Sequence, residues 1–327
     1  MAVRTGIVMP RQRGAAVVTA LLVVALCVTL VTTMFVQQQA STRAVESRRL
    51  RAQGEAMQDA ITAWAVAVVQ ESGTQSSIDH LRQRWAEPRP PAPLAAWIGA
   101  AAASHATLSG AGDIEVGAEI EDAQGRFNLM TLVTAASLSE PPGVSAVGVQ
   151  AYRRLLASLS LDTSLAAPTA DYILRTLRPD GPLPLLRAAD LRAVRGYTPQ
   201  AVARLAPFVV ALPEPTSLNI NTAGPELLAA FVPGLTVSQA STLIADRDRA
   251  YWRGVSDLSL RAAAMTPAGG ELQGLMLDAG SHYFIVHGTV RSGRAVRRVQ
   301  ALLYRSGIGV AVRTRVLWVR EPDDAAP

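Results

Sequence analysis

The hydrophobic pattern of the chain begins with one long apolar stretch. Residues 15–36 form 22 consecutive positions without a charged side chain. A helix of that length spans about 33 Å, enough to cross the ~30 Å hydrocarbon core of a bilayer. Such a helix also satisfies its own backbone hydrogen bonds, which lipid cannot do. The stretch therefore predicts a membrane anchor near the N-terminus.

The helical period continues beyond the anchor. One stripe is formed by apolar residues at steps of seven, four, three and four: Leu50, Met57, Ile61, Trp64 and Val68. This spacing favours a single helix over residues 15–70, with its second half packed on a soluble domain. The alternative is two helices with a break near Gly54. We expect the helix to end at 71–73, with Gly73 in a C-cap position.

From residue 114 the pattern changes to alternation, which predicts a half-buried strand over 114–121. We expect a turn at 122–125 and a second short strand from Arg126. The end of the chain, 281–320, predicts a three-stranded antiparallel meander with glycine-containing turns. Before these strands, residues 78–85 are expected to form a short helix. The run Pro88–Pro93 is expected to be a loop.

The middle of the chain has helical periodicity with short breaks. The expected helices cover 147–159, 170–177, 188–195, 199–212, 225–231, 237–248 and 255–264. The predicted fold class is α+β, a long N-terminal helix packed on a small antiparallel sheet with a large all-helical insertion. The expected divisions are 1–14 (leader), 15–36 (membrane helix), 37–133 (helix and first strands), 134–265 (insertion), 266–320 (last strands) and 321–327 (tail).

Composition adds few constraints. All 31 basic residues are arginine, and the net charge is +5. The single cysteine, Cys27, excludes an intrachain disulfide and a CxxC metal site. The four histidines are scattered at positions 80, 105, 282 and 287, and no catalytic motif is present, so we expect no enzymatic activity. Eight arginines lie within 291–320. They indicate either the solvated face of a sheet or a contact face for an acidic partner.

A basic segment ending in Gly14 precedes the apolar run. A glycine on the charged side of such a run resembles the type IV prepilin leader, which a dedicated peptidase cuts after the glycine. Cleavage is then expected between Gly14 and Ala15; the alternative is an uncleaved anchor. The fifth mature position carries Thr19, where major pilins and pseudopilins have glutamate. A carboxylate in lipid needs a partner, such as the amine of a neighbouring subunit. Thr19 therefore indicates a subunit at the tip of a filament.

Three further segments resemble the minor pseudopilin K family of type II secretion systems. Residues 119–132 read EIEDAQGRFNLMTL, with Met130 where that family usually has asparagine. Residues 217–247 begin SLNINTAGPELL, and residues 281–284 read SHYF. In the second segment, Asn221 or Thr222 is expected to cap a helix that starts with Pro225 and Glu226.

The resemblance implies a tip complex with minor pseudopilins I and J, above a filament of major pseudopilin G. It also implies processing by prepilin peptidase and a single-pass inner-membrane protein whose C-terminal domain is in the periplasm. Relatives bind calcium through acidic loops of the insertion. Here the corresponding segment, 171–180, has Leu174 and Arg175 in place of carboxylates. No metal ligand is therefore assigned, and no cofactor is expected.

A second hypothesis rests on residues 217–247, which also resemble a DNA-binding helix-hairpin-helix. In such a module, backbone N–H groups of a glycine-rich turn bind a phosphate. Basic and aromatic residues follow: Arg247, Arg249, Tyr251, Trp252 and Arg253. However, the turn 234–236 lacks its second glycine, and Asp246 and Asp248 lie among the arginines. The alternative function, a membrane-anchored periplasmic DNA-binding protein of a competence-like system, is therefore the weaker prediction.

Overall fold

The computed structural model of the chain describes residues 13–98, 114–134, 141–267, 272, 274–293, 295–307 and 309–322. The chain divides into two compact units, Met1–Ala56 and Met57–Pro327. The first 12 residues of the predicted leader, His105 and tail residues 323–327 lie outside the described residues.

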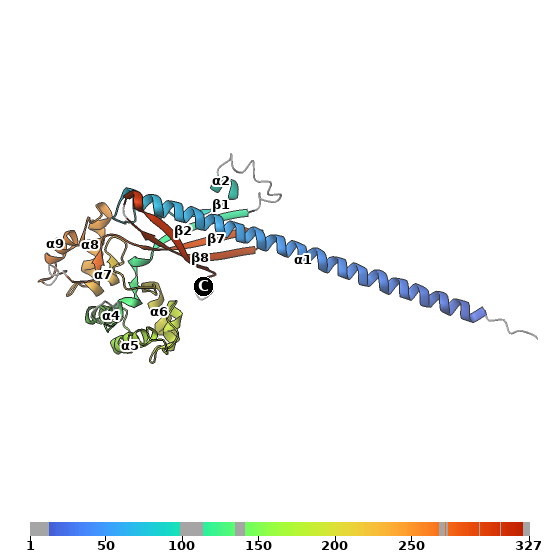
Figure 1. Ribbon diagram of the computed structural model, residues 1–327, viewed down its shortest axis with the longest axis horizontal. Coiled ribbons are helices and arrows are strands. Elements are labelled where there is room, and N and C mark those ends of the chain that lie inside the picture. Colours follow the sequence, from blue (N-terminus) through green and yellow to red (C-terminus); the bar gives the residue numbers. More distant parts are fainter. Residues whose placement is uncertain are drawn as a thin grey trace, which may run out of the picture. The chain divides into compact units, whose positions relative to one another are not determined.

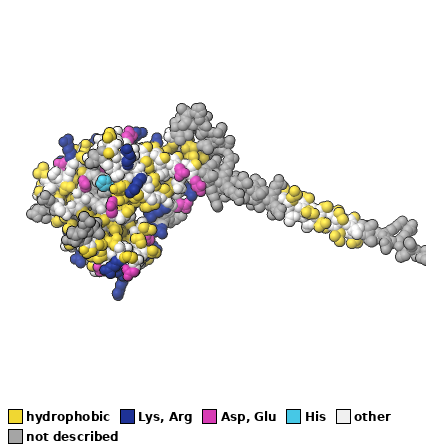
Figure 2. Space-filling view, viewed as in Figure 1, with side chains coloured by type: hydrophobic (Ala, Val, Ile, Leu, Met, Phe, Trp, Pro, Cys, Tyr) yellow, Lys and Arg dark blue, Asp and Glu magenta, His cyan; other side chains and the backbone are white. Residues whose placement is uncertain are grey.

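Helix α1 (Arg13–Gln75) begins in the first unit and ends in the second. Its residues Val17–Phe35 are apolar, exposed and numerous enough for a membrane span, and their side chains gather along the helix in Figure 2. Threonine hydroxyls in this span donate back to helix carbonyls, as Thr32 does to Val28 at 2.7 Å. The helix includes Gly54, so the single-helix prediction is confirmed rather than the break.

The second unit contains a five-stranded antiparallel sheet in the order β1-β2-β7-β8-β9 (Figure 1). The strands are β1 (Arg89–Pro93), β2 (Ile114–Asp122), β7 (Tyr283–Ser292), β8 (Ala295–Ser306) and β9 (Arg313–Arg320). The predicted meander is confirmed, although residues 309–311 form a 3₁₀ turn (η9) before the last strand. The predicted loop at Pro88–Pro93 is wrong. Its prolines fit a strand because β1 is an outer strand of the sheet.

The last turns of α1 pack on one face of this sheet. The buried helix residues are Met57, Ile61, Ala65, Val68 and Val69, and they share a core with sheet residues such as Val286 and Val299. Figure 1 shows α1 lying along β2, β7 and β8 within this unit. The helix extends to Gln75, so Gly73 is not a C-cap as predicted. A Cβ on Gly73 would lie 2.8 Å from Arg305 Cδ, so the glycine makes room for that side chain.

The insertion between β2 and β7 holds most of the remaining elements and forms its own hydrophobic core. Its α-helices are α4 (Ala146–Ser158), α5 (Ala166–Thr176), α6 (Pro199–Leu205), α7 (Pro225–Phe231), α8 (Val237–Arg249) and α9 (Val255–Ala263). Its 3₁₀ turns are η3 (Ala123–Gly125), η4 (Leu129–Leu132), η5 (Thr163–Leu165), η6 (Ala188–Ala193) and η7 (Ala206–Phe208). Short parallel pairs join β3 (Phe127–Asn128) to β4 (Val209–Val210), and β5 (Leu218–Asn219) to β6 (Leu277–Asp278).

Three predicted helices differ from the structure. Residues 78–85 form turns that lead into a 3₁₀ turn, η1 (Arg84–Ala86), and the short α2 (Leu94–Ile98) follows β1. Residues 188–193 form η6 instead of an α-helix. The predicted helix 199–212 ends at Leu205, because Pro207 cannot continue the hydrogen-bond pattern and the chain turns into β4.

Candidate functional site

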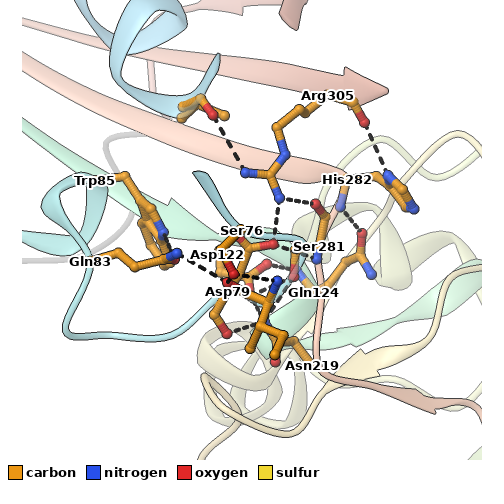
Figure 3. A network of polar contacts seen from close by, with 12 residues as sticks. Ser76, Asp79, Gln83, Trp85, Asp122, Gln124, Asn219, Ser281, His282 and Arg305 are labelled. Carbon is orange, nitrogen blue, oxygen red and sulfur yellow. Dashed lines mark hydrogen bonds and ion pairs between the residues drawn. The ribbon is translucent and has the colours of Figure 1, made fainter. Parts of the chain in front are cut away.

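The segments singled out in the sequence meet at one buried polar cluster (Figure 3). Asp122 comes from the end of β2, Asn219 from β5, and Ser281 from the residues just before β7. All three side chains are at most 3% exposed. The cluster therefore joins the sheet to the insertion, and we refer to it as the sheet–insertion joint.

Asp122 is the centre of the joint. Its Oδ2 accepts hydrogen bonds from Asn219 Nδ2 at 2.8 Å, Thr222 Oγ1 at 2.6 Å and Ser281 Oγ at 2.7 Å. Its Oδ1 accepts the Gln124 N–H at 2.9 Å, which caps the turn η3. A Cβ on Gly125 would lie 2.9 Å from Thr222 Oγ1, so the glycine allows this close approach. One carboxylate thus connects three distant segments of the chain.

The sequence did not indicate a second pair in the joint, Asp79 and Arg305. Arg305 Nη2 donates to Asp79 Oδ2 and, at 2.8 Å, to the Ser281 carbonyl, and the Ser281 N–H donates to Asp79 Oδ2 at 2.8 Å. Asp79 is fully buried, and the Arg305 side chain is 6% exposed. The two residues are 226 positions apart. Such a separation carries no periodic signal from which the pair could have been predicted.

The electrostatics of the joint favour a single negative charge. Burial, together with the neighbouring charge of Asp79, raises the pKa of Asp122 to about 6, although hydrogen bonds from Thr222 and Ser281 oppose this shift. Burial also raises the pKa of Asp79, although the guanidinium of Arg305 opposes this. Two buried carboxylates thus lie close together, and the guanidinium of Arg305 contacts Asp79. This arrangement disfavours the doubly ionised form.

The predicted helix cap at Asn221 or Thr222 is wrong. Helix α7 has Gly224 at its N-cap position, with no side-chain cap. Asn221 instead donates from Nδ2 to the Trp252 carbonyl at 2.9 Å and accepts the Trp252 N–H at 2.9 Å. Thr222 donates to Asp122. Both polar side chains are used by distant backbone and side-chain groups, so neither is available to the helix that follows them.

The groups expected to contact DNA are engaged within the protein. The Thr236 N–H at the start of α8 donates to Gln239 Oε1 at 2.9 Å, and Thr236 Oγ1 accepts the Gln239 N–H. Arg247 is 6% exposed and donates to the carbonyls of Ile220 and Ala223, while Trp252 is fully buried. Thr236 of the turn and two of the five proposed contact residues therefore serve packing, which disfavours the DNA-binding alternative.

The segment 171–180 does not fit a calcium site. Calcium prefers six to eight oxygen ligands with several carboxylates, whereas Asp171 and Asp180 are separated by exposed arginines at 175 and 178. Within the described ranges, no three His, Cys, Asp or Glu side chains lie together as metal ligands would. His282 and His287 are held separately, by the Arg305 carbonyl at 3.0 Å and by Glu121 at 3.1 Å.

The predicted processing residues lie at the start of α1. Gly14 and Ala15 are in its first turn, and Thr19 lies two residues into the span Val17–Phe35. The structure thus places the helix start next to the predicted cleavage point. Cleavage itself and the filament position indicated by Thr19 stay predictions.

Comparison with known proteins gives one consistent result. Two family models described as type II secretion system protein K match residues 125–214 and 218–275. A type II secretion system protein K from Pseudomonas aeruginosa is 28% identical over 86% of this chain and 85% of its own length. A type II secretion system protein K from Pectobacterium carotovorum is 26% identical over 93% of this chain and 96% of its own length. A chain in the crystal structure of the GspK-GspI-GspJ complex of enterotoxigenic Escherichia coli has the same fold, with a TM-score of 0.62. The match covers 84% of this chain and 99% of that chain, with 21% sequence identity.

Proposed function

Since the chain belongs to the type II secretion system protein K family, we propose that it is a minor pseudopilin at the tip of the pseudopilus and starts its assembly. In this role the protein is structural. It positions related subunits and supports protein export across the outer membrane. Membrane insertion, subunit contact and a bulky end domain are the physical requirements of this role.

The observation that carries the proposal is the composition of α1. One part of the helix, Val17–Phe35, is apolar and exposed, whereas the part from Met57 to Val69 is buried against the sheet. A helix with exposed apolar residues over a membrane-spanning length is stable in lipid or against similar helices. The same helix therefore supplies a single-pass anchor and a segment that packs in the folded domain.

The insertion supports a terminal position in the filament. Its described residues contain α4–α9 and form their own core between two neighbouring strands of the sheet, β2 and β7. The family resemblance gives this insertion the role of obstructing further subunits. Thr19 agrees with that role, since a terminal subunit has no neighbour whose amine could neutralise a carboxylate in the membrane. The proposed location is the inner membrane, with the second unit in the periplasm.

The proposed partners are minor pseudopilins I and J, the proteins named with the K subunit in the E. coli complex. The test is to co-produce the full chain carrying a C-terminal affinity tag with I and J of the same organism, and to purify it from detergent-solubilised membranes. We expect I and J to co-purify with it. A matched preparation without I and J gives the background recovery of other membrane proteins. Recovery of the tagged chain without I and J would contradict the proposal.

A further inference from the structure

Strand β9 forms an open edge of the sheet. It pairs with β8 on one side, and no described strand pairs with its other side. The opposite edge, β1, contains three prolines, which cannot donate backbone hydrogen bonds. An unprotected edge strand presents N–H and C=O groups with which another extended chain can pair. The two edges of this sheet therefore differ in their capacity to accept a further strand.

The free backbone groups of β9 can be located from its register. The Thr314 N–H donates to Gln70 Oε1 of α1 at 3.2 Å, so it points away from β8 and is already satisfied. Two residues further on, Val316 directs its N–H and C=O to the same open side. Leu317 has no partner in the register with β8 and forms a bulge. The bulge shifts the alternation of backbone N–H directions, so Val319 is the next residue whose N–H points to the open side. The open edge therefore starts where the contact with α1 ends.

The side chains of this edge are apolar. Residues 316–319 are Val-Leu-Trp-Val, a run without a charge and with high β propensity. The side chains of Val316 and Val319 are 39% exposed. An exposed apolar edge strand of this kind is a pairing site unless something covers it. The apolar composition of residues 316–319 favours, as the occupant of this edge, a bound strand that supplies hydrogen-bond partners for the backbone of β9 and apolar side chains beside Val316 and Val319.

The charges of β9 indicate what that occupant is. The strand contains Arg313, Arg315 and Arg320 and no acidic residue. The guanidinium of Arg315 lies 5.1 Å from the Tyr304 ring centroid, and that of Arg320 lies 4.1 Å from the Trp318 ring centroid, so both are held at the sheet surface. Two copies of β9 paired with each other would bring arginines together, which is unfavourable. An acidic strand is complementary.

We propose that β9 is a docking edge for an extended, acidic segment of another protein, which adds as one more strand to the sheet. Backbone hydrogen bonds to Val316 and Val319 give the affinity. The flanking arginines select for glutamate or aspartate and against a second copy of this chain. This docking edge lies in the sheet and not in the membrane helix, so it stands independently of the function proposed above.

The test uses the full chain in detergent and a fluorescent peptide of alternating valine and glutamate. Val316→Pro removes the outward N–H without touching the hydrogen bonds to β8, and Val316→Thr is its matched control because it keeps the N–H. Loss of one hydrogen bond is expected to weaken peptide binding by about tenfold in Val316→Pro. Binding to Val316→Thr should match that of the unchanged chain. A peptide of alternating valine and lysine should not bind.

A second variant keeps the proposal testable if Val316→Pro does not fold. The double variant Arg313→Glu/Arg315→Glu should reverse the preference, so that the lysine peptide binds and the glutamate peptide does not. Three results would overturn the proposal. They are equal binding of the glutamate peptide to folded Val316→Pro and Val316→Thr, no binding of that peptide to the unchanged chain, or concentration-dependent pairing of β9 with a second copy.

Discussion

Ile61 of α1 packs against the bare Cα of Gly288 on β7. A Cβ built on Gly288 would lie 3.1 Å from Ile61 Cδ1 and 2.4 Å from Val299 Cγ1. The helix can approach the sheet this closely because the residue beneath it has no side chain. The contact fixes the distance between the second part of α1 and the strands.

Gly288→Ala is therefore expected to destabilise the folded domain. Overpacking of a close contact costs about 1–3 kcal/mol, since the helix or the Val299 side chain must move. The measurement is the midpoint of thermal or urea unfolding of the full chain. Gly254→Ala is the matched control, because the nearest heavy atom to its new Cβ is 3.9 Å away. Equal effects of the two substitutions would show that Gly288 is not a spacing residue.

The Asp79–Arg305 pair gives a second prediction. Arg305→Met leaves the carboxylate of Asp79 buried without its guanidinium, which is expected to cost about 3–5 kcal/mol. The double variant Asp79→Asn/Arg305→Met removes both charges and should recover part of this loss. Arg84→Met is the control, because its ion pair with Glu71 is exposed and worth at most about 1 kcal/mol. A double variant no more stable than Arg305→Met would contradict this reasoning.

Asp122 gives a prediction about pH. Its pKa is about 6 in the folded chain and has a usual value of 3.8, so the folded state holds its proton more tightly. The free energy of unfolding should therefore fall as the pH rises through this window and then level off. The slope from this group is at most about 1.4 kcal/mol per pH unit. Asp79, also raised, adds in the same direction.

The variant Asp122→Asn isolates this effect. Its carboxamide does not titrate, so the difference in unfolding free energy between the unchanged chain and the variant should depend on pH between about 4 and 6. Chemical unfolding at a series of pH values measures this difference. A constant difference across that window would show that Asp122 has an ordinary pKa in the folded protein.

Gly14 gives a prediction about processing. With prepilin peptidase present, Gly14→Val should keep the chain at full length, because the leader motif requires glycine before the cut. Gly6→Val is the matched control within the same leader and should be processed normally. Both are compared by their mobility on a gel after membrane extraction. Processing of Gly14→Val would exclude cleavage after this residue.

Local sequence patterns predicted most of the fold. The alternation in 114–121 identified β2, and the helical periods identified α4, α7 and α8 to within a residue or two. In β2, α4 and α8 the buried positions follow the period of the element, whereas α7 is buried over consecutive residues. The β1 strand was missed because proline excludes central strands, and the edge position that permits it is set by the sheet as a whole.

The joint was predicted only in part. Asp122, Asn219 and Ser281 lie in segments singled out from the sequence, but their mutual hydrogen bonds follow from the fold. Asn221 and Thr222 have the side chains of helix caps, yet tertiary partners bind them instead. Glycine often ends helices, but Gly73 lies within α1 and makes room for the Arg305 side chain.

The N-terminal residue of the mature protein shows whether the chain is processed as a pseudopilin. The full chain, produced with its own prepilin peptidase and isolated from membranes, can be analysed by intact mass and N-terminal sequencing. We expect a chain that begins at Ala15, with the apolar helix at its new terminus. A functional protein that still begins at Met1 would contradict it.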